Sequence, residues 1–412
     1  MSVNELERFW TELLEIEGPW KVSDVRLEEE DGSKEVHIRL EVPKGSLVKC
    51  PECGTLCKVH DRVKDRTWRD TDTAGRRTYV HADVPRADCP EHGVKRIDIP
   101  WARPGSGFTL LMESMIMAMV RQMPVKTVGD MIGEYPGRIW TLVRVYSKKL
   151  VDGLDLSGVF RVAVDEKCFS GRDSFITVFV DIGTGRIIYV AEGKDSSAVF
   201  SFRQFLEEHG GKRENITDFS CDFGNTFVSA VRKYFPSSKI TADRFHLIKM
   251  ANTALNDTKC GELRLTVNRM KAKYLLLRNP SKMSPEDLLL KDKICRDNEV
   301  LGIAYRLKES LCSVYFLDDA YSAEEHLKGW MRWAKMTGLY HFIKLAGTVE
   351  KHIAHILQWF NSRITNAVME GTNSMISVIK SRARGYKHAS SLISMCYLVS
   401  AQENTDMYGR GV

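Results

Sequence analysis

A change of hydrophobic pattern near residue 245 constrains the fold of this 412-residue chain more than any other feature. Between residues 160 and 242, short apolar or alternating runs recur between turn signals, which predicts strands. From about residue 245 to residue 400, apolar residues recur at helical spacing almost throughout. We therefore expect a mixed α/β part followed by a long helical part, and the sequence has no obvious internal repeat.

The predicted elements of the mixed part have a defined order. They are strands at 160–165, 175–182 and 186–191, a helix at 198–209, a strand from Ile216 to Asp222, a helix near 226–234 and a strand at 239–242. A meander of three strands followed by strand–helix–strand is the order of an RNase H-like domain. The predicted fold class is thus multidomain α/β, with an RNase H-like catalytic domain that carries a large all-helical insertion.

Three carboxylates lie where such a domain can hold metal ions. Asp165 closes the first predicted strand, and Asp222 ends a later one before the break at Phe223-Gly224-Asn225. Glu370 lies in a predicted helix over 366–381. Three converging carboxylates can bind two Mg²⁺ ions, which suit oxygen ligands and leave positions for water and phosphate. Spacing alone does not select these three among the 54 acidic residues, because a strand-end Asp is commonly a turn former or helix cap.

The predicted helix around Glu370 has two stripes. One is apolar and the other polar, and the polar stripe carries the carboxylate. The apolar stripe consists of Val368, Met375, Ile376 and Ile379, and the polar one of Glu370, Asn373, Ser377 and Lys380.

Cysteines and a histidine near the N-terminus have the spacing of a zinc site. Cys50 and Cys53 form a Cys-x-x-Cys pair followed by Gly54, and Cys89 and His92 form a second pair. Two such pairs complete a tetrahedral Zn²⁺ site, which would be structural because four protein ligands leave no open position. Cys57 and His60 compete for the third and fourth positions, and free buried cysteines are the alternative to a metal.

A DNA-binding region is predicted between the cysteine-bearing segment and the first strand of the mixed part. Residues 108–150 read as helices with breaks at Pro124 and Pro136-Gly137, which suits a helix-turn-helix with its turn near the second break. Val143 and Val145 are expected inside. The basic residues that can face DNA there are Arg138, Arg144, Lys148 and Lys149. The alternative is a solvated face of a helical connector.

The charge distribution supports a nucleic-acid partner more than the total does. The net charge of +6 is a weak signal. After Glu370, however, the chain runs to Gln402 without an acidic residue, and we expect Lys380, Arg382 and Arg384 to contact phosphates near the catalytic centre. The first twenty residues do not read as a signal peptide and no stretch is long enough to span a bilayer, so a cytoplasmic, nucleoid-associated protein is expected.

Aromatic residues and histidines of the helical part have two interpretations. Trp330, Trp333 and Trp359 are expected in the core, with base stacking as the alternative. His352 and His355 can form a metal-binding pair, but a satisfied or exposed pair is the simpler interpretation.

At the acidic residues the sequence resembles the ISL3 family of bacterial insertion-sequence transposases, over nearly the whole chain. The matching stretches are Val164-Asp165-Glu166, Cys221-Asp222 followed by Phe227, Ala242-Asp243-Arg244-Phe245-His246, Glu370-Gly371-Thr372-Asn373, Arg384-Gly385-Tyr386, Gly18-Pro19-Trp20 and Cys50-Pro51-Glu52-Cys53-Gly54. Each is weak alone, but their order and spacing together are specific. The role of Asp243 and His246 stays open between a helix cap and a contact that supports the active site.

The resemblance implies a DDE transposase that binds terminal inverted repeats and catalyses metal-dependent cleavage and strand transfer. It implies Asp165, Asp222 and Glu370 as catalytic Mg²⁺ (or Mn²⁺) ligands, a homodimer or larger assembly, and target DNA as a second partner. The rival functions are a catalytically silent DNA-binding regulator and another RNase H-like nuclease. The expected divisions are 1–104 with the zinc-binding segment, 105–155 with the helix-turn-helix, 156–250 with the first part of the catalytic core, 251–360 with the helical insertion, and 361–412 with the catalytic helix and C-terminal helices.

Overall fold

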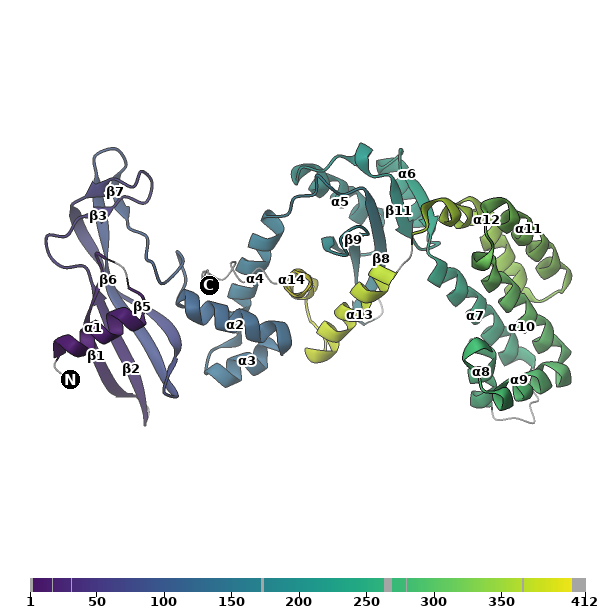
Figure 1. The fold of residues 1–412 in the computed structure, drawn as a ribbon, viewed down its shortest axis with the longest axis horizontal. Helices are drawn as coiled ribbons and strands as arrows, with labels where there is room; N and C mark the ends of the chain where they lie inside the picture. Colours follow the sequence, from purple (N-terminus) through teal and green to yellow (C-terminus); the bar gives the residue numbers. More distant parts are fainter. Residues whose placement is uncertain are drawn as a thin grey trace. The chain divides into compact units, whose positions relative to one another are not determined.

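The computed structural model describes residues 3–16, 18–30, 32–171, 174–262, 269–278, 280–364 and 367–401. They form two compact units, one of which extends to Val145 while the other comprises Tyr146–Ser400 (Figure 1). None of the helices in these ranges combines the length and hydrophobicity needed to cross a membrane.

The first unit is built on a twisted sheet with strand order β1-β2-β6-β5, to which β7 adds by pairing with β6. Alternate residues of β2 and β6, such as Ile38, Leu40, Val80 and Ala82, are buried, as expected for strands with one face in a core. The bounds are α1 Val3–Leu13, β1 Lys21–Glu30, β2 Ser33–Glu41, β3 Val48–Lys49, β4 Leu56–Cys57, β5 Val59–Thr73, β6 Arg76–Cys89 and β7 Gly93–Arg96.

Strand β5 was not predicted from the sequence. The sequence of β5, VHDRVKDRTWRDTDT, carries charges at both alternating sets of positions, so it has no period-2 hydrophobic signal before Trp68. It is a strand because it pairs antiparallel with the apolar β6 along most of its length. Trp68 is buried and packs edge-to-face against Trp101 at a ring-centroid distance of 5.6 Å.

Three helices follow the sheet: α2 Leu110–Gln122, α3 Val125–Ile132 and α4 Pro136–Asp152. The predicted turn near Pro136-Gly137 lies slightly earlier, because Gly133 ends α3 in the left-handed conformation (φ 67°) and Pro136 begins α4. Val143 is buried as expected, but Val145 is 37% exposed, so its predicted inward orientation is wrong. Backbone hydrogen bonds of Arg69 to Gly107 and Thr109 join β5 to this helical region.

The second unit contains a five-stranded sheet with the order β10-β9-β8-β11-β12. Strands β8, β9 and β10 form an antiparallel meander, whereas β11 pairs in parallel with both β8 and β12. The order of these elements along the chain is the one predicted from the sequence. The bounds are β8 Arg161–Ser170, β9 Ser174–Asp181, β10 Ile187–Glu192, α5 Ser196–Glu208, β11 Asp218–Cys221, α6 Asn225–Tyr234 and β12 Lys239–Ala242.

Helices cover both faces of this sheet. Val162 and Val164 of β8 belong to the same buried cluster as Phe202 of α5 and Val231 of α6. The C-terminal helices α13 (Ala367–Arg382) and α14 (Ala389–Ser400) pack against β8 and against β9 and β10. Because side chains alternate along a strand, Asp165 lies on the face opposite to Val162 and Val164. That face is the one on which α13 packs.

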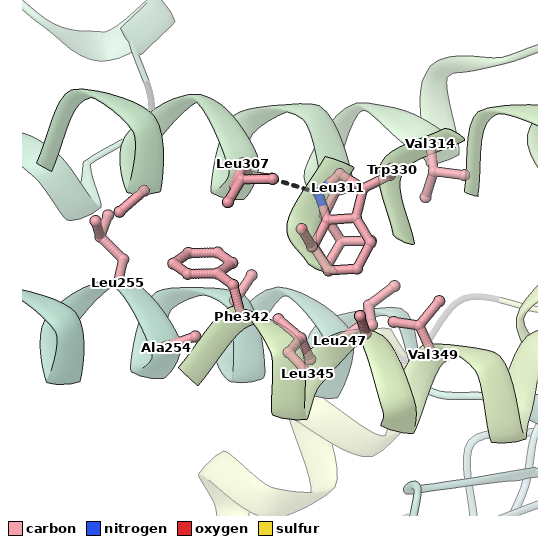
Figure 2. Packing of buried hydrophobic residues seen from close by; sticks show 14 of the residues in the cluster. Leu247, Ala254, Leu255, Leu307, Leu311, Val314, Trp330, Phe342, Leu345 and Val349 are labelled. Atoms are coloured by element: carbon pink, nitrogen blue, oxygen red, sulfur yellow. Dashed lines mark hydrogen bonds between the residues drawn. The ribbon is translucent and has the colours of Figure 1, made fainter. Parts of the chain in front are cut away.

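Helices separate β12 from α13 along the chain. Their bounds are α7 Arg244–Glu262, α8 Arg269–Leu277, α9 Pro285–Asp297, α10 Glu299–Cys312, α11 Ala320–Met336 and α12 Tyr340–Ser362. Figure 2 shows their core, in which Trp330 Nε1 donates a hydrogen bond of 2.8 Å to the carbonyl of Leu307. Trp330 and Trp359 are buried and Trp333 packs against the same cluster, which confirms the core interpretation of these tryptophans.

Candidate active site and metal centre

The register of three parallel strands aligns the two predicted aspartates at one edge of the second sheet. Ser220 of β11 pairs with Ala163 of β8, and Cys221 pairs with Ala242 of β12. Continuing each register by one or two residues places Asp222 level with Asp165 on one side and with Asp243 on the other. Three aspartates therefore lie on adjacent strands where the parallel pairing ends, the position at which active sites of open α/β sheets form.

Asp165 does not close its strand, which corrects the prediction. Strand β8 continues to Ser170 because its antiparallel ladder with β9 extends beyond Asp165, which pairs with Val178. Only the parallel pairing with β11 stops before Asp165. The sequence pattern missed this extension because polar residues follow Asp165, as in the segment Asp165-Glu166-Lys167.

Helix α13 makes a direct contact with Asp165. Asn373 Nδ2 donates a hydrogen bond of 2.6 Å to Asp165 Oδ2, while Asp165 Oδ1 accepts one of 2.8 Å from the backbone N–H of Glu166. Further along the helix, Lys380 Nζ donates to the carbonyl of Cys168 in the same strand. Two of the four residues of the predicted polar stripe, Asn373 and Lys380, therefore contact β8.

Glu370 lies on the same helix, three residues before Asn373, and its side chain is exposed. Residues three apart on a helix are neighbours on its surface, so Glu370 flanks the residue that holds Asp165. The buried side of α13 consists of Met369, Thr372, Ile376 and Ile379, which replaces Val368 and Met375 in the predicted apolar stripe. The start of the predicted helix, at residue 366, lies outside the described residues.

The acidic side chains at this edge influence the titration of their neighbours. Burial, followed by the nearby charges of Asp222 and Asp165, raises the pKa of Glu166, although Lys194 partly offsets them. A hydrogen bond from His246 Nδ1 to Asp243 Oδ2 (2.6 Å) raises the pKa of His246, and the charges of Asp165 and Asp222 add to this effect. These mutual effects show that the carboxylates of Asp165 and Asp222 are close to both Glu166 and His246.

Asp243 combines two of the roles left open. It is 4% exposed, its Oδ1 accepts a hydrogen bond from the backbone N–H of Phe245 in the first turn of α7, and its Oδ2 holds His246. Helix capping and orientation of an imidazole beside the acidic edge are thus performed by one carboxylate. Lys167 lies near Asp165, and Lys249 lies near Lys167; the sequence did not single out either lysine.

The four predicted zinc ligands lie together. One ligand atom from each of Cys50, Cys53, Cys89 and His92 lies within 4.8 Å of the others. The Sγ atoms of Cys53 and Cys89 are 3.7 Å apart, and Nδ1 of His92 is 3.6 Å from Cys89 Sγ and 3.9 Å from Cys50 Sγ. Zn–S bonds of about 2.3 Å at tetrahedral angles give sulfur–sulfur separations of about 3.8 Å. The geometry therefore fits zinc.

Two turns of the first unit present these ligands, one of them in the separate two-stranded sheet formed by β3 and β4. Cys50 and Cys53 lie on the turn between β3 and β4, and Cys89 and His92 lie at the hairpin between β6 and β7. Cys57 Sγ instead hydrogen-bonds to the carbonyl of Thr55, and His60 lies 3.9 Å from Asp88. Both competitors are thus outside the cluster. Within the described ranges, no other group of three or more Cys, His, Asp or Glu has ligand atoms this close together, so the acidic edge is more open.

The predicted DNA-binding side chains differ in whether other groups of the protein contact them. Arg138 forms an ion pair of 2.6 Å with Glu134 and lies over the ring of Phe108, so protein contacts occupy it. Lys148 pairs with Asp152, whereas Arg144 and Lys149 are exposed on α4. At the end of α13, Lys380 contacts β8, and Arg382 and Arg384 are exposed.

His352 and His355 are buried, with their Nδ1 atoms 3.3 Å apart at a kink of α12. Arg232 contacts His355 at 3.1 Å. Burial and the charge of Arg232 lower the pKa of His355 to about 4, so this pair is satisfied within the protein.

Comparison with known proteins agrees with this arrangement. The family model DDE_Tnp_ISL3, described as transposase, matches residues 162–396, which is more than half of the chain. A helix-turn-helix domain of transposase family ISL3 matches residues 97–146, and a zinc-finger of the transposases of IS204, IS1001, IS1096 and IS1165 matches residues 46–92.

Two curated relatives extend over almost the whole chain. The transposase for insertion sequence element IS1557 of Mycobacterium tuberculosis is 25% identical over 98% of this chain and 97% of its own length. The transposase for insertion sequence element IS1001 of Bordetella parapertussis is 22% identical over 91% of this chain and 94% of its own length. With a zinc ribbon, a helix-turn-helix and a DDE transposase domain in this order, the chain belongs to the ISL3 family of DNA transposases.

Proposed function

We propose that this transposase binds the terminal inverted repeats of its own element and cuts and joins DNA at Asp165, Asp222 and Glu370. The observation that carries the proposal is the hydrogen bond from Asn373 to Asp165, because it brings the helix that bears Glu370 to the edge where Asp165 and Asp222 are level. The strand order β10-β9-β8-β11-β12 supports an RNase H-like core, in which α7 to α12 form an insertion ahead of the catalytic helix.

The residues at the edge fit Mg²⁺ or Mn²⁺. Carboxylate oxygens are the ligands that these hard cations prefer. Burial raises the pKa of Glu166, and the charges of Asp222 and Asp165, which a cation would neutralise, raise it further. In addition, Asn373 Oδ1 is buried without a hydrogen-bond partner among the described residues, and it can accept a hydrogen bond from a water on a bound cation. Bound metal would supply charge stabilisation at the phosphate and acidify the attacking water.

The chain's own residues position the reaction. Asn373 holds Asp165 in one orientation, and Asp243 fixes the imidazole of His246 beside the same edge. A water oxygen attacks phosphorus in line, the bond from phosphorus to the departing 3′-oxygen breaks, and that oxygen takes up a proton as the 3′-hydroxyl of the element end. The hydroxyl then attacks a phosphodiester of target DNA in the same manner, without a covalent protein intermediate.

The first unit serves recognition in this proposal. Cys50, Cys53, Cys89 and His92 hold a structural zinc ion, and the helix-turn-helix with Arg144 and Lys149 contacts the inverted repeat. Lys380, Arg382 and Arg384 contact phosphates near the cleavage site. The active species is a homodimer or larger assembly that holds two element ends together.

The test is cleavage of DNA that carries the element's own ends, taken from the sequence flanking the gene. Full-length protein with Mg²⁺ is expected to cut at the end, with Ca²⁺ to bind without cutting, and with Glu370→Gln to bind without cutting in either ion. Binding without metal-dependent cleavage by the unaltered protein would instead support a silent DNA-binding regulator.

A further inference from the structure

A groove between α7 and α12 carries chemistry that the proposed active site does not use. Its volume is about 380 Å³. His246 lies at one end, and Asp257 and His341 lie at the other, 4.0 Å apart. From His246 to Asp257 there are eleven residues of helix, which at 1.5 Å per residue gives a length of about 16 Å. Since one DNA strand advances about 3.4 Å per nucleotide, this length corresponds to about four to five nucleotides of backbone.

The lining of the groove suits a sugar–phosphate backbone. Met250, Ala254 and Leu345 supply apolar surface, and exposed Lys249 and Lys344 supply positive charge. Neither lysine has an ion-pair partner in the part of the chain that the structure describes. The one acidic group of the lining, Asp257, faces His341. Two available ammonium groups above an apolar floor favour a phosphodiester over a neutral or cationic ligand.

The groove opens at the acidic edge. Its first residue, His246, is held by Asp243, which is level with Asp222 in the register of the sheet. Lys249, one turn further along α7, is close enough to Lys167 of β8 for its charge to act there. Lys167 follows Asp165 by two residues and so lies on the same face of the strand. A strand that leaves the edge on this side therefore enters the groove directly.

We propose that this groove holds the backbone of one DNA strand next to the cleavage site, with His246 and Lys249 at the nearer phosphates and Lys344 at a further one. The placement of the cleavage site rests on the proposed function, whereas the phosphate-binding capacity of the groove does not. Asp243 is a positioning residue in this arrangement, because it acts through His246.

The test uses full-length protein with Asp165→Ala, so that bound DNA is not cut, and a duplex that carries the element's own end. The double variant Lys249→Gln, Lys344→Gln is compared with Lys293→Gln, an exposed lysine of α9 that does not line the groove. The slope of log affinity against log salt is expected to fall by about 0.7–0.9 for each groove lysine removed and to stay unchanged in the control. An unchanged slope in the double variant would overturn the proposal.

A second measurement places the contact. In cleavage-competent protein, ethylation of single phosphates within about four nucleotides of the cut is expected to block cleavage. Lys344→Gln protein should become insensitive to ethylation at one of these positions, and the same interference pattern in both proteins would count against the groove. If unaltered protein does not cleave at all, the proposed function fails, while the salt slope still decides whether the groove binds DNA.

Discussion

The zinc cluster and the acidic edge both gather side chains of types that can bind metal ions, but they do so in different ways. Cys50, Cys53, Cys89 and His92 lie on two turns of one small region, with their ligand atoms within 4.8 Å of one another. Asp165 and Asp222 instead come from adjacent parallel strands, and Glu370 comes from a helix that follows the whole helical region. The first site is closed by local structure, and the second depends on contacts between distant parts of the chain.

Charge explains why the two arrangements differ. Thiols and an imidazole together carry less charge at neutral pH than the same number of carboxylates, so they can lie close together before a metal binds, whereas ionised carboxylates repel one another. Burial raises the pKa of Glu166, and repulsion from the charges of Asp222 and Asp165 at the acidic edge raises it further. A structural zinc site uses all four positions for protein ligands, but a catalytic site has to leave room for water and phosphate. A compact cluster and an open edge are therefore suited to different functions.

The largest effect of a substitution is expected at the zinc cluster. Cys89→Ser should abolish zinc binding and unfold the ribbon region, since structural zinc contributes on the order of 10 kcal/mol to the folding of such segments. The measurements are zinc content and calorimetric unfolding of the purified protein. Cys57→Ser, which changes a cysteine outside the cluster, should retain one zinc per chain. A full zinc complement in the Cys89 variant would show that the cluster is not the zinc site.

At the acidic edge, substitutions are expected to change the rate of DNA cleavage and not the stability of the fold. Asp165→Asn, Asp222→Asn and Glu370→Gln should each lower cleavage by at least about a thousandfold, because each would remove a metal ligand. Affinity for the element end and the unfolding midpoint should change little. The matched control is Glu208→Gln, an exposed acid on α5. Near-normal cleavage by the Glu370 variant would exclude that residue from the mechanism.

A smaller effect is expected when the contact between α13 and β8 is removed. Asn373→Leu removes the hydrogen bond to Asp165 and should lower cleavage by about 10–100-fold, the range for partners that orient metal ligands. The rate should recover partly at higher Mn²⁺ concentration, because orientation is lost and the ligands remain. Ser377→Ala, one turn along on the same stripe and bonded only to a backbone carbonyl, is the control. Equal rates in the two variants would contradict this role.

The smallest effect concerns repulsion at the edge. A raised pKa means that the folded state binds the Glu166 proton more tightly than the unfolded state does. The ionised carboxylate therefore destabilises the folded state above the raised pKa. Below the ordinary pKa of 4.5, where Glu166 is protonated in both states, this destabilisation is absent. In metal-free protein at neutral pH, Glu166→Gln should therefore raise the free energy of unfolding by less than about 1 kcal/mol, because solvent screens the charges, and the unfolding midpoint should rise slightly. The gain should vanish near pH 4. A lower midpoint at neutral pH would contradict this account.

The sequence predicted the local features well. Cysteine spacing selected the four residues of the cluster, and hydrophobic periodicity predicted the succession of strands and helices in the mixed part and the helical character after residue 245. The polar stripe of the helix that carries Glu370 was also predicted from spacing, and its Asn373 and Lys380 contact β8.

Features that depend on a neighbouring strand or helix were not predictable in this way. The charged strand β5 exists because β6 pairs with it, and β8 passes Asp165 because β9 continues beside it. Glu370 was selected by resemblance, since nothing in its own helix distinguishes it from other exposed acids. The groove lysines, Lys249 and Lys344, lie on helices that are far apart in sequence, and only the packing of α7 on α12 brings them together.

The contact between Asn373 and Asp165 joins residues separated by 208 positions. During synthesis the ribosome releases Asp165 and Asp222 long before α13, and contacts of such long separation form late. A nascent chain, or one shortened by a premature stop codon after residue 360, would carry DNA-binding segments and two of the three proposed catalytic acids but no means to cut. A gene damaged in its last eighth would then encode a competitor for the element's ends, which could restrain intact copies in the same cell.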